Sequence, residues 1–324
     1  MNQPPYPHSS GQPDPEQQAA TPGCWWHPNR PTALSCARCG RPACPDCLRE
    51  AAVGFQCTDC VQTGQRQQRT QEKQYRAAGL GVTTIAGTRP LDKAVVTPIL
   101  IGVNVAIYLI TAVLAKSPWD NERSTLFNDW VLFPPSVGLN GEWWRLLTSG
   151  FLHLGPIHIA VNMLSLWMIG RDLERLLGKV RFLAVYFIAM LGGGAAVYLF
   201  ADPGTATAGA SGALYGLLGA LLVAVLRLKL NPGTVIGTIV LNLALTYAIP
   251  GISVFAHLGG LVTGVVAMVA IVYAPAKNRV AWQAGMLVVV LVAAIGLVFV
   301  RNAEFSQLTC TQESTGAVTC VSDR

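Results

Sequence analysis

The sequence predicts an all-α membrane protein with several transmembrane helices, preceded by a small cysteine-rich domain. Of the 324 residues, 52% are hydrophobic and only 12% are charged, which excludes an ordinary soluble globular protein. Seven stretches are apolar over about the 20 residues that a helix needs to cross a bilayer. Seven of the nine cysteines lie between residues 24 and 60, ahead of the first of these stretches.

The apolar stretches set the order of the predicted elements. Residues 1–23 are rich in Pro, Gln and Ser, a composition that predicts disorder. Residues 61–93 are rich in Gln and Arg and are expected to form a polar linker. The N-terminus lacks the apolar segment of a cleavable signal peptide. The seven predicted spans are residues 94–115, 150–170, 181–200, 209–226, 233–249, 252–273 and 282–300.

Lys and Arg residues predict the orientation of these spans. They gather before the first span and in every second connection after it, and cytoplasmic connections carry the excess of basic residues. We therefore expect a cytoplasmic N-terminus and an extracytoplasmic C-terminus. The net charge of +6 follows from this topology, so no nucleic-acid partner is expected. The location expected is the plasma membrane of a bacterial cell, with the lipid bilayer as immediate partner.

The cysteine-rich segment, residues 24–60, contains four ligand pairs separated by two residues each. Eight ligands suffice for two tetrahedral Zn²⁺ ions and leave no open position for catalysis. Spacing alone leaves the pairing open, although joining the first pair with the third and the second with the fourth would resemble the cross-brace of B-box and RING-like fingers. Disulfides are the alternative, which a reducing cytoplasm disfavours. The pairs are Cys24 and His27, Cys36 and Cys39, Cys44 and Cys47, and Cys57 and Cys60.

The role of this module is open at the level of sequence. Zinc can simply allow so short a segment to fold, or the module can bind a cytoplasmic protein partner or regulate the membrane domain. At the other end of the chain, Cys310 and Cys320 follow the last span. On the outer side of the membrane a disulfide between them is expected to close a short loop.

Polar side chains within the spans point to chemistry, because each is costly in hydrocarbon. Ser211 and His257 lie near the starts of the fourth and sixth spans, which run in the same direction and place them within about one turn in depth. The second span carries His153, His158 and Asn162, the last two being one turn apart on one face. A neutral histidine can accept a serine proton while an amide donates to an oxyanion. The set predicts a nucleophile and its base.

Each of these residues has an ordinary structural explanation when taken alone. A serine among small residues is typical of close helix packing, and His257 or Asn162 can join helices by hydrogen bonds. Their convergence in one layer favours a catalytic site. A transporter would instead carry ionisable residues at mid-membrane or matching broken helices, and the sequence shows no such repeat. The small residues near the serine are Gly209, Gly212, Gly216 and Gly219.

These residues and their spacing resemble the rhomboid family of intramembrane serine proteases. The resemblance covers residues 94–273, six helices in the family's order. A seventh helix within residues 274–300, the tail of residues 301–324 and the cysteine-rich module lie outside it. The matching motifs are Gly209-x-Ser211-Gly212 with Tyr215, His257-x-x-Gly260-x-x-x-Gly264, His153 with His158-x-x-x-Asn162, Trp144-Arg145 in the first external connection, and Gly170-x-x-x-Glu174-x-x-x-Gly178 after the second span.

The resemblance implies roles for the polar residues. Ser211 would be the nucleophile and His257 the general base and later the general acid, acting through an acyl-enzyme without a cofactor. Asn162, His158 and the Ser211 backbone N–H would form the oxyanion hole, and Tyr215 would pack against the imidazole. No acidic residue occupies the outer half of a span, so a dyad is expected, although Asp202 in the preceding loop is not excluded. His153 is expected to be a structural hydrogen bonder.

The substrates implied are transmembrane segments of other membrane proteins, cut near their outer end after local unwinding, because helical backbone groups are otherwise satisfied. The alternative is a catalytically silent member of the same fold that binds transmembrane partners, which the loss of Ser or His would mark. Water must reach Ser211 through a polar cavity open to the outside. Arg145 would anchor the long, aromatic-rich first connection at the interface. Glycines 259, 260 and 264 are expected to let the fourth and sixth helices approach closely.

Overall fold

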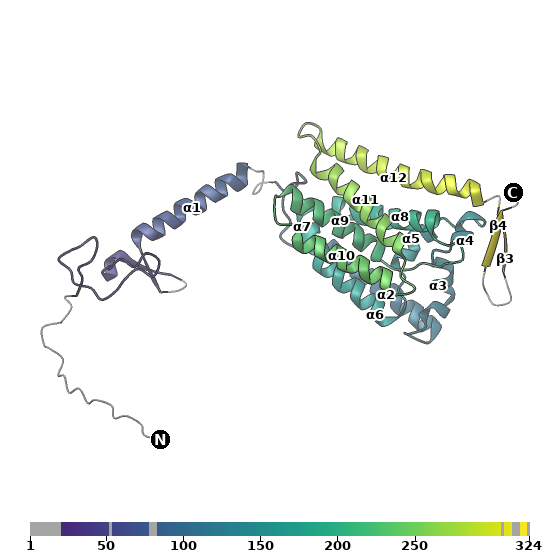
Figure 1. Cartoon of the computed structure of the whole chain (residues 1–324), viewed down its shortest axis with the longest axis horizontal. Helices are drawn as coiled ribbons and strands as arrows, with labels where there is room; N and C mark the ends of the chain where they lie inside the picture. The colour runs from purple at the N-terminus through teal and green to yellow at the C-terminus, as the bar shows by residue number, and fades with distance from the viewer. Residues whose placement is uncertain (1–20, 52–53, 78–82, 306–307, 313–317, 323–324) are drawn as a thin grey trace, which may run out of the picture. The chain divides into compact units, whose positions relative to one another are not determined.

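The computed structural model describes residues 21–51, 54–77, 83–305, 308–312 and 318–322. Contacts divide the chain into two compact units, Met1–Ala78 and Gly79–Arg324. Helices make up most of the described chain (Figure 1). The second unit is the all-α polytopic bundle that the sequence predicts, and the chain is a multi-pass membrane protein.

The first unit has little regular structure before its single helix. A short 3₁₀ helix η1 (Pro45–Cys47) leads into an antiparallel pair of strands, β1 (Leu48–Glu50) and β2 (Phe55–Cys57). Helix α1 (Thr58–Ala77) follows directly, so the first part of the segment expected as a linker is helical. Cysteines form most of the buried cluster of this unit, which fits a module too small for an aliphatic core.

Four described helices of the second unit are long and apolar enough to cross a bilayer. They correspond to the first, third, sixth and seventh predicted spans. They are α2 (Val96–Ala115), α8 (Lys179–Phe200), α11 (Val254–Val272) and α12 (Arg279–Phe305).

The second predicted span is a bent pair of helical segments. Residues Arg145–Phe151, which comprise α5 (Arg145–Thr148) and the 3₁₀ helix η3 (Ser149–Phe151), meet Gly155–Leu177 at 93°. The longer arm runs through α6 (Gly155–Ser165), the π-helical segment η4 (Leu166–Gly170) and α7 (Arg171–Leu177). The fourth and fifth predicted spans are shorter apolar helices, α9 (Ser211–Arg227) and α10 (Gly233–Ala248).

Six of the seven predicted helix starts differ from the structure, and glycines with positive φ explain two of the differences. The second long helix begins at residue 155 and continues to 177 instead of covering 150–170, because Leu154 is extended and Gly155 has φ +70°. The fourth helix begins at Ser211 instead of residue 209, because Gly209 has φ +132°. Only glycine adopts such a conformation readily. The two glycines therefore determine where these helices begin.

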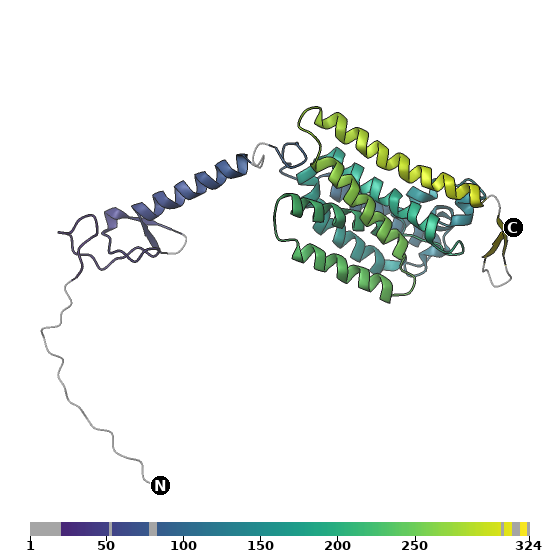
Figure 2. The same cartoon turned by 45° about the horizontal axis from the view of Figure 1, so that its top comes forward.

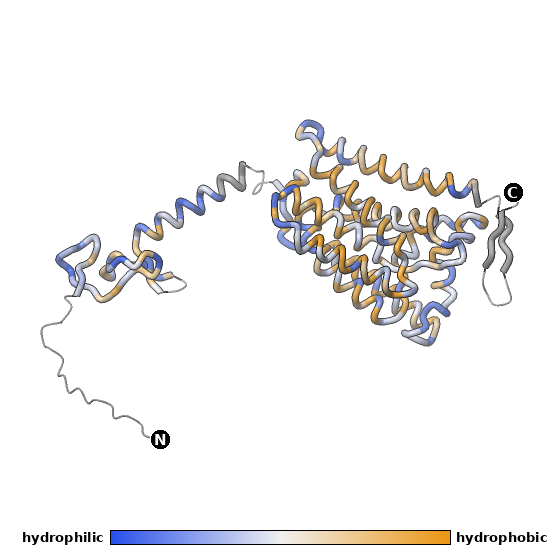
Figure 3. Tube along the Cα trace, in the orientation of Figure 1, coloured by the Kyte–Doolittle hydropathy of each residue, from blue (hydrophilic) through white to orange (hydrophobic). Residues whose placement is uncertain are grey.

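The bundle exposes apolar side chains along its outer helices. Val113 on α2, Ile157 on α6 and Val240 on α10 are among many large hydrophobic residues that face outward, and apolar residues cover the helices while polar ones gather in the connections (Figure 3). Apolar surface of this extent is what a bilayer covers.

Helices α8, α9 and α11 pack against one another, while α12 lies along α8 and α11 (Figures 1 and 2). Glycine makes the contact of α9 with α11 possible: a Cβ on Gly264 would lie 2.2 Å from the carbonyl oxygen of Gly216. The expectation for Gly259 is wrong, since its added Cβ would meet Gly192 and Ala196 of α8. The rotation of α11 turns neighbouring glycines toward different helices.

The connection between α2 and α6 contains short helices of its own. It contains the 3₁₀ helix η2 (Asn121–Arg123), α3 (Thr125–Trp130) and α4 (Pro134–Gly138). Arg145 is buried, its Nη1 donates to the carbonyls of Asn128 and Val131, and its Nε donates to Glu142. Trp144 is half exposed and donates its indole N–H to the carbonyl of Asp129.

Glu174, on α7, links the end of the second predicted span to the start of α2. Its buried carboxylate accepts the backbone N–H groups of Val95, Val96 and Thr97 and the Thr97 hydroxyl, all at 2.7–2.8 Å. The first N–H groups of a helix have no partner within the helix. Glu174 therefore caps α2 from another helix.

The tail after α12 contains strands β3 (Leu308–Gln312) and β4 (Val318–Ser322), paired antiparallel. Cys310 and Cys320 are Cα partners in this ladder. The disulfide between them stays a prediction.

Candidate active site and metal centres

Ser211 and His257 meet where α9 and α11 cross. Ser211 is the first residue of α9 and is partly exposed, whereas His257 lies in the first turn of α11 and is buried. The Ser211 Oγ lies 2.8 Å from His257 Nε2. Glycine again permits this approach, because a Cβ on Gly260 would lie 1.9 Å from the carbonyl oxygen of Gly212. The arrangement suits proton transfer from the hydroxyl to the imidazole.

The turn before Ser211 is fixed by backbone contacts. The N–H of Gly209 donates to the carbonyl of Ser149 at 2.9 Å, and the positive φ of Gly209 turns the chain into α9. A Cβ at Gly209 would also lie 3.0 Å from His158 Nε2 and 3.7 Å from Ser211 Oγ. Glycine at this position therefore brings His158 and Ser211 to the same side of the turn.

Besides Ser211, two groups contact the His257 ring. The ring of Tyr215 stacks on it, with centroids 4.0 Å apart and an interplanar angle of 15°. The hydroxyl oxygen of Thr246, on α10, lies 2.7 Å from His257 Nδ1. The same oxygen lies 2.8 Å from the Tyr215 hydroxyl and 2.8 Å from the carbonyl of Asn242.

Sequence reasoning missed Thr246. It considered only acidic residues as partners for the histidine, and a threonine in an apolar helix gives no signal by composition. Asp202 does not fill this place, because it is exposed and its carboxylate accepts the N–H of Gly204.

His158 and Asn162 lie on α6 beside this pair. The N–H of Leu154 donates to His158 Nδ1 at 3.2 Å, so the neutral ring carries its proton on Nε2. Asn162 is buried and donates one amide hydrogen to the carbonyl of His158 at 2.8 Å, leaving the second hydrogen available. The buried ring of His153 lies against that of His158, with centroids 5.1 Å apart. Among the described residues neither of its ring nitrogens has a hydrogen-bond partner, so the structural hydrogen bonding expected of this side chain is not seen, and only the backbone carbonyl of His153 accepts from Asn121.

A small hollow adjoins the start of α9. It is lined by Ser149, Thr207, Gly209 and Gly212 together with apolar residues such as Met190. Neither Ser211 nor His257 lines it. The polar, water-holding cavity expected above Ser211 thus stays a prediction.

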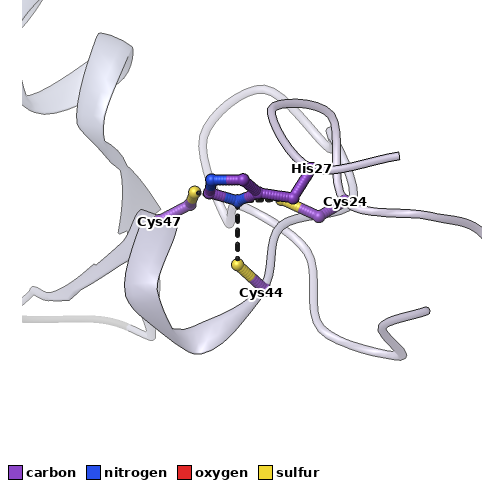
Figure 4. Close-up of side chains that lie close together, drawn as sticks. All are labelled: Cys24, His27, Cys44 and Cys47. Atoms are coloured by element: carbon purple, nitrogen blue, oxygen red, sulfur yellow. Dashed lines mark hydrogen bonds between the residues drawn. The ribbon is translucent and has the colours of Figure 1, made fainter. Parts of the chain in front are cut away.

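The first unit brings its cysteine and histidine side chains into two clusters. One contains Cys24, His27, Cys44 and Cys47 (Figure 4), and the other contains Cys36, Cys39, Cys57 and Cys60. Within each cluster the ligand atoms lie within 4.8 Å of one another. This grouping is the interleaved one, first pair with third and second with fourth.

The spacing of these atoms matches tetrahedral coordination. His27 Nδ1 lies 3.7, 3.5 and 3.4 Å from the sulfurs of Cys24, Cys44 and Cys47 (Figure 4), and the Cys39 and Cys57 sulfurs are 3.8 Å apart. Metal bonds of ordinary length for Zn²⁺ in a tetrahedron give about 3.6 Å between nitrogen and sulfur and about 3.8 Å between two sulfurs. Both clusters can therefore hold a metal ion.

The thiols within these clusters have diverging pKa values. Burial opposes ionisation of Cys36, but the N–H groups of Cys57, Cys39 and Arg38 outweigh it and lower its pKa to about 6. Burial and the thiols of Cys44 and Cys24 raise the pKa of Cys47 to about 12. Each cluster thus contains at least one thiol that ionises easily and at least one that does not. A bound cation would relieve that opposition, since coordinated thiols are deprotonated.

Comparisons with known proteins agree with the geometry. The family model described as Rhomboid domain matches residues 140–274. The chain is 41% identical over 141 residues to Rhomboid protease GluP of Bacillus subtilis, which covers 42% of this chain and 27% of that protein. It is 32% identical over 224 residues to Rhomboid protease AarA of Providencia stuartii, covering 59% of this chain and 77% of that protein.

A plant relative extends the comparison. RHOMBOID-like protein 4 of Arabidopsis thaliana is 31% identical over 235 residues, covering 62% of this chain and 58% of that protein. The matches to GluP and to this plant protein thus span less than two thirds of the length of each relative. The matched region contains Ser211, His257, His158 and Asn162 in the family model, and the cysteine clusters precede it.

Proposed function

The chain belongs to the rhomboid family, and from that premise we propose that it is an intramembrane serine endopeptidase that cleaves transmembrane segments of other membrane proteins. The observation that carries the proposal is the 2.8 Å contact between Ser211 Oγ and His257 Nε2. Serine is a weak nucleophile unless an adjacent base accepts its proton. Here that base approaches from a neighbouring helix and is held by a stacked tyrosine.

In the proposed reaction, Ser211 Oγ attacks the scissile carbonyl carbon while His257 Nε2 accepts the hydroxyl proton. The tetrahedral intermediate collapses as His257 gives this proton to the leaving amine, which leaves an acyl-enzyme. A water molecule then attacks the ester, His257 accepts its proton, and the proton returns to Ser211. No cofactor takes part in these steps.

The negative oxygen of the intermediate would be stabilised by three donors. His158 offers Nε2–H, since its Nδ1 accepts from Leu154. The free amide hydrogen of Asn162 and the backbone N–H of Ser211, which is the first residue of α9, would complete the set. Donors aimed at a developing oxyanion contribute a large share of catalysis in acyl transfer.

We also propose that the first unit binds two structural Zn²⁺ ions, one in each Cys/His cluster. The tetrahedral spacing and the cysteine-rich ligand sets support zinc among the metals that thiolates select. All eight ligands are used, so the module has no catalytic position. Its proposed role is to bind or regulate through a cytoplasmic protein partner.

The proposed location is the plasma membrane, with the N-terminal module in the cytoplasm and the C-terminal tail outside. The distribution of Lys and Arg along the chain supports this orientation. Ser211 and His257 would then lie in the outer half of the membrane. The substrate would be cut near its outer end.

A fluorophosphonate probe, which reacts with activated serines, tests the proposal together with cleavage of a generic transmembrane substrate in detergent. Wild-type protein should be labelled and should cleave, whereas Ser211→Ala should do neither and His257→Ala should lose most of both. Persistent labelling of Ser211→Ala would show that another residue is the nucleophile. A folded wild-type protein that neither reacts nor cleaves would instead favour a catalytically silent member that binds transmembrane partners.

A further inference from the structure

The hydroxyl of Thr246 lies at the centre of a buried hydrogen-bond network. Its oxygen is within 2.7–2.8 Å of three groups: His257 Nδ1, the Tyr215 hydroxyl and the carbonyl of Asn242. A threonine hydroxyl has one proton to donate and can accept two hydrogen bonds. The three contacts use this capacity completely if Thr246 donates one hydrogen bond and accepts the other two.

The carbonyl of Asn242 decides where the protons are. A carbonyl oxygen can only accept, so the single Thr246 proton must point to it. Thr246 can then only accept from the other two groups. The Tyr215 hydroxyl donates to Thr246, and the His257 Nδ1 must carry a hydrogen and donate as well.

The opposite arrangement has a specific cost. If Thr246 donated to an unprotonated Nδ1, its oxygen would face the Asn242 carbonyl at 2.8 Å with no proton between them. Thr246 is buried, and leaving the hydrogen bond of a buried polar group unmade is unfavourable. The network therefore selects the Nδ1–H form of the neutral imidazole. That form leaves the Nε2 lone pair facing Ser211 Oγ.

The burial of Thr246 supports this assignment. Within α10, the buried residues are Ile239 and Thr246, whereas most of the helix is exposed. The hydroxyl that α10 places inside the bundle is thus the one that reaches the histidine of α11. Asp202, the acidic residue that the sequence left open as a third member, is exposed and bonded within its own loop.

We propose that Thr246 is a positioning residue, which accepts the Nδ1–H of His257 and so holds the imidazole in the tautomer able to take the Ser211 proton. It fills with a neutral oxygen the place that a carboxylate occupies in a Ser-His-Asp triad. Tyr215 assists it twice, by stacking on the ring and by donating to the same oxygen. The proposal rests on the proposed peptidase function.

The test compares Thr246→Val, which keeps the shape and removes the acceptor, with Thr246→Ser, which keeps the hydroxyl. A matched control is Thr238→Val, on the same helix, because Thr238 is only half-buried and its hydroxyl bonds only the carbonyl of Thr234 among the described contacts. Full-length protein in detergent is assayed for kcat and KM. Nitrogen-15 NMR of histidine-labelled protein, with the His257→Gln spectrum identifying its signals, reports the tautomer directly.

Thr246→Val should lower kcat by about 10- to 100-fold with little change in KM, less than the about 10⁴-fold that a wrong tautomer costs in a carboxylate triad. Thr246→Ser should restore most of the rate, and Thr238→Val should match the wild type. The wild-type spectrum should show His257 protonated at Nδ1, and Thr246→Val should show protonation moving toward Nε2.

Three results would overturn the proposal: an Nε2–H tautomer in the wild type, an unchanged kcat in Thr246→Val, or equal losses in the Val and Ser variants, which would mean a packing role. The NMR measurement needs no turnover. If the wild type does not cleave at all and Ser211→Ala behaves identically, the peptidase function fails, while the tautomer of His257 still tests the assignment of Thr246. A Thr246→Val protein that does not fold leaves the wild-type spectrum and the Ser variant to decide.

Discussion

Gly260 of α11 lies so close to Gly212 of α9 that a single added methyl group would come within 1.9 Å of the Gly212 carbonyl oxygen. Gly212 directly follows Ser211, and Gly260 lies one turn after His257. The helix crossing and the Ser211–His257 contact are therefore one feature of the structure. A change that widens the crossing must also lengthen the contact.

Gly260→Ala should abolish most of the activity and destabilise the bundle. The obstacle is a backbone carbonyl, which cannot move aside as a flexible side chain could, and overpacking of this kind costs about 1–3 kcal/mol or more. Cleavage and fluorophosphonate labelling measure the loss of activity, and thermal unfolding in detergent measures the loss of stability. Gly285→Ala on α12 is the control, since its Cβ meets nothing within 4 Å. Wild-type rates in folded Gly260→Ala would contradict the link between crossing and catalysis.

Glu174→Gln should lower the free energy of unfolding by roughly 2–4 kcal/mol, because an amide NH₂ group would replace one oxygen and face backbone N–H donors in a buried site. The carboxylate accepts four hydrogen bonds at the start of α2. Thermal or denaturant unfolding in detergent gives the measurement. Asp172→Asn, an exposed acidic residue on the same helix with a 3.8 Å ion pair to Arg175, should change stability little. Equal effects of the two variants would argue against the capping role.

The first unit should contain two zinc ions per chain, and Cys44→Ser and Cys57→Ser should each remove one. Each variant breaks a different cluster, and a site with three remaining ligands binds zinc far more weakly. Metal analysis of purified protein counts the ions. Loss of both ions in either single variant would mean that the two clusters fold only together, and two retained ions would contradict the ligand sets.

Removing residues 1–60 should leave cleavage by the purified protein in detergent within a few-fold of the wild type, because the proposed catalytic residues all lie in the second compact unit. The assay uses a generic transmembrane substrate, with Ser211→Ala in the same truncated background as the control. Complete loss of activity in a truncated protein that is folded would reject the idea and assign the module a direct part in the reaction.

The sequence was enough to predict the fold class because apolar length is a one-dimensional property. Six of the seven predicted spans each correspond to one helix, and the second corresponds to a bent pair of helical segments. Helix starts were harder, since they depend on local backbone angles such as those of Gly155 and Gly209. Helix α1 was missed because a stretch rich in Gln and Arg was interpreted as a linker, although these residues are good helix formers.

The candidate site was predictable where the residue type itself carries the chemistry. Ser211, His257, His158 and Asn162 are polar groups that hydrocarbon makes costly, so they stand out in an apolar chain. Thr246 does not, because a threonine can satisfy its hydroxyl on its own helix. Its second and third contacts depend on how α10 is rotated toward α9 and α11. Likewise the side of α11 on which Gly259 lies depends on helix rotation, which spacing alone does not give.

The oxyanion donors give the last prediction. His158→Ala and Asn162→Ala should each lower kcat by about 10²–10³-fold with KM nearly unchanged, since removal of one oxyanion donor has this effect in acyl transfer. His158→Ala is expected to have the larger structural consequence, because His158 Nδ1 also accepts the N–H of Leu154, a hydrogen bond that alanine cannot make. Ser165→Ala is the control on the same helix, where an exposed hydroxyl bonds only the carbonyl of Val161 among the described contacts. Labelling by fluorophosphonate should slow in parallel with cleavage, because the probe forms a similar tetrahedral centre with a negative oxygen. A raised KM with unchanged kcat would place these side chains in substrate binding and outside the oxyanion hole.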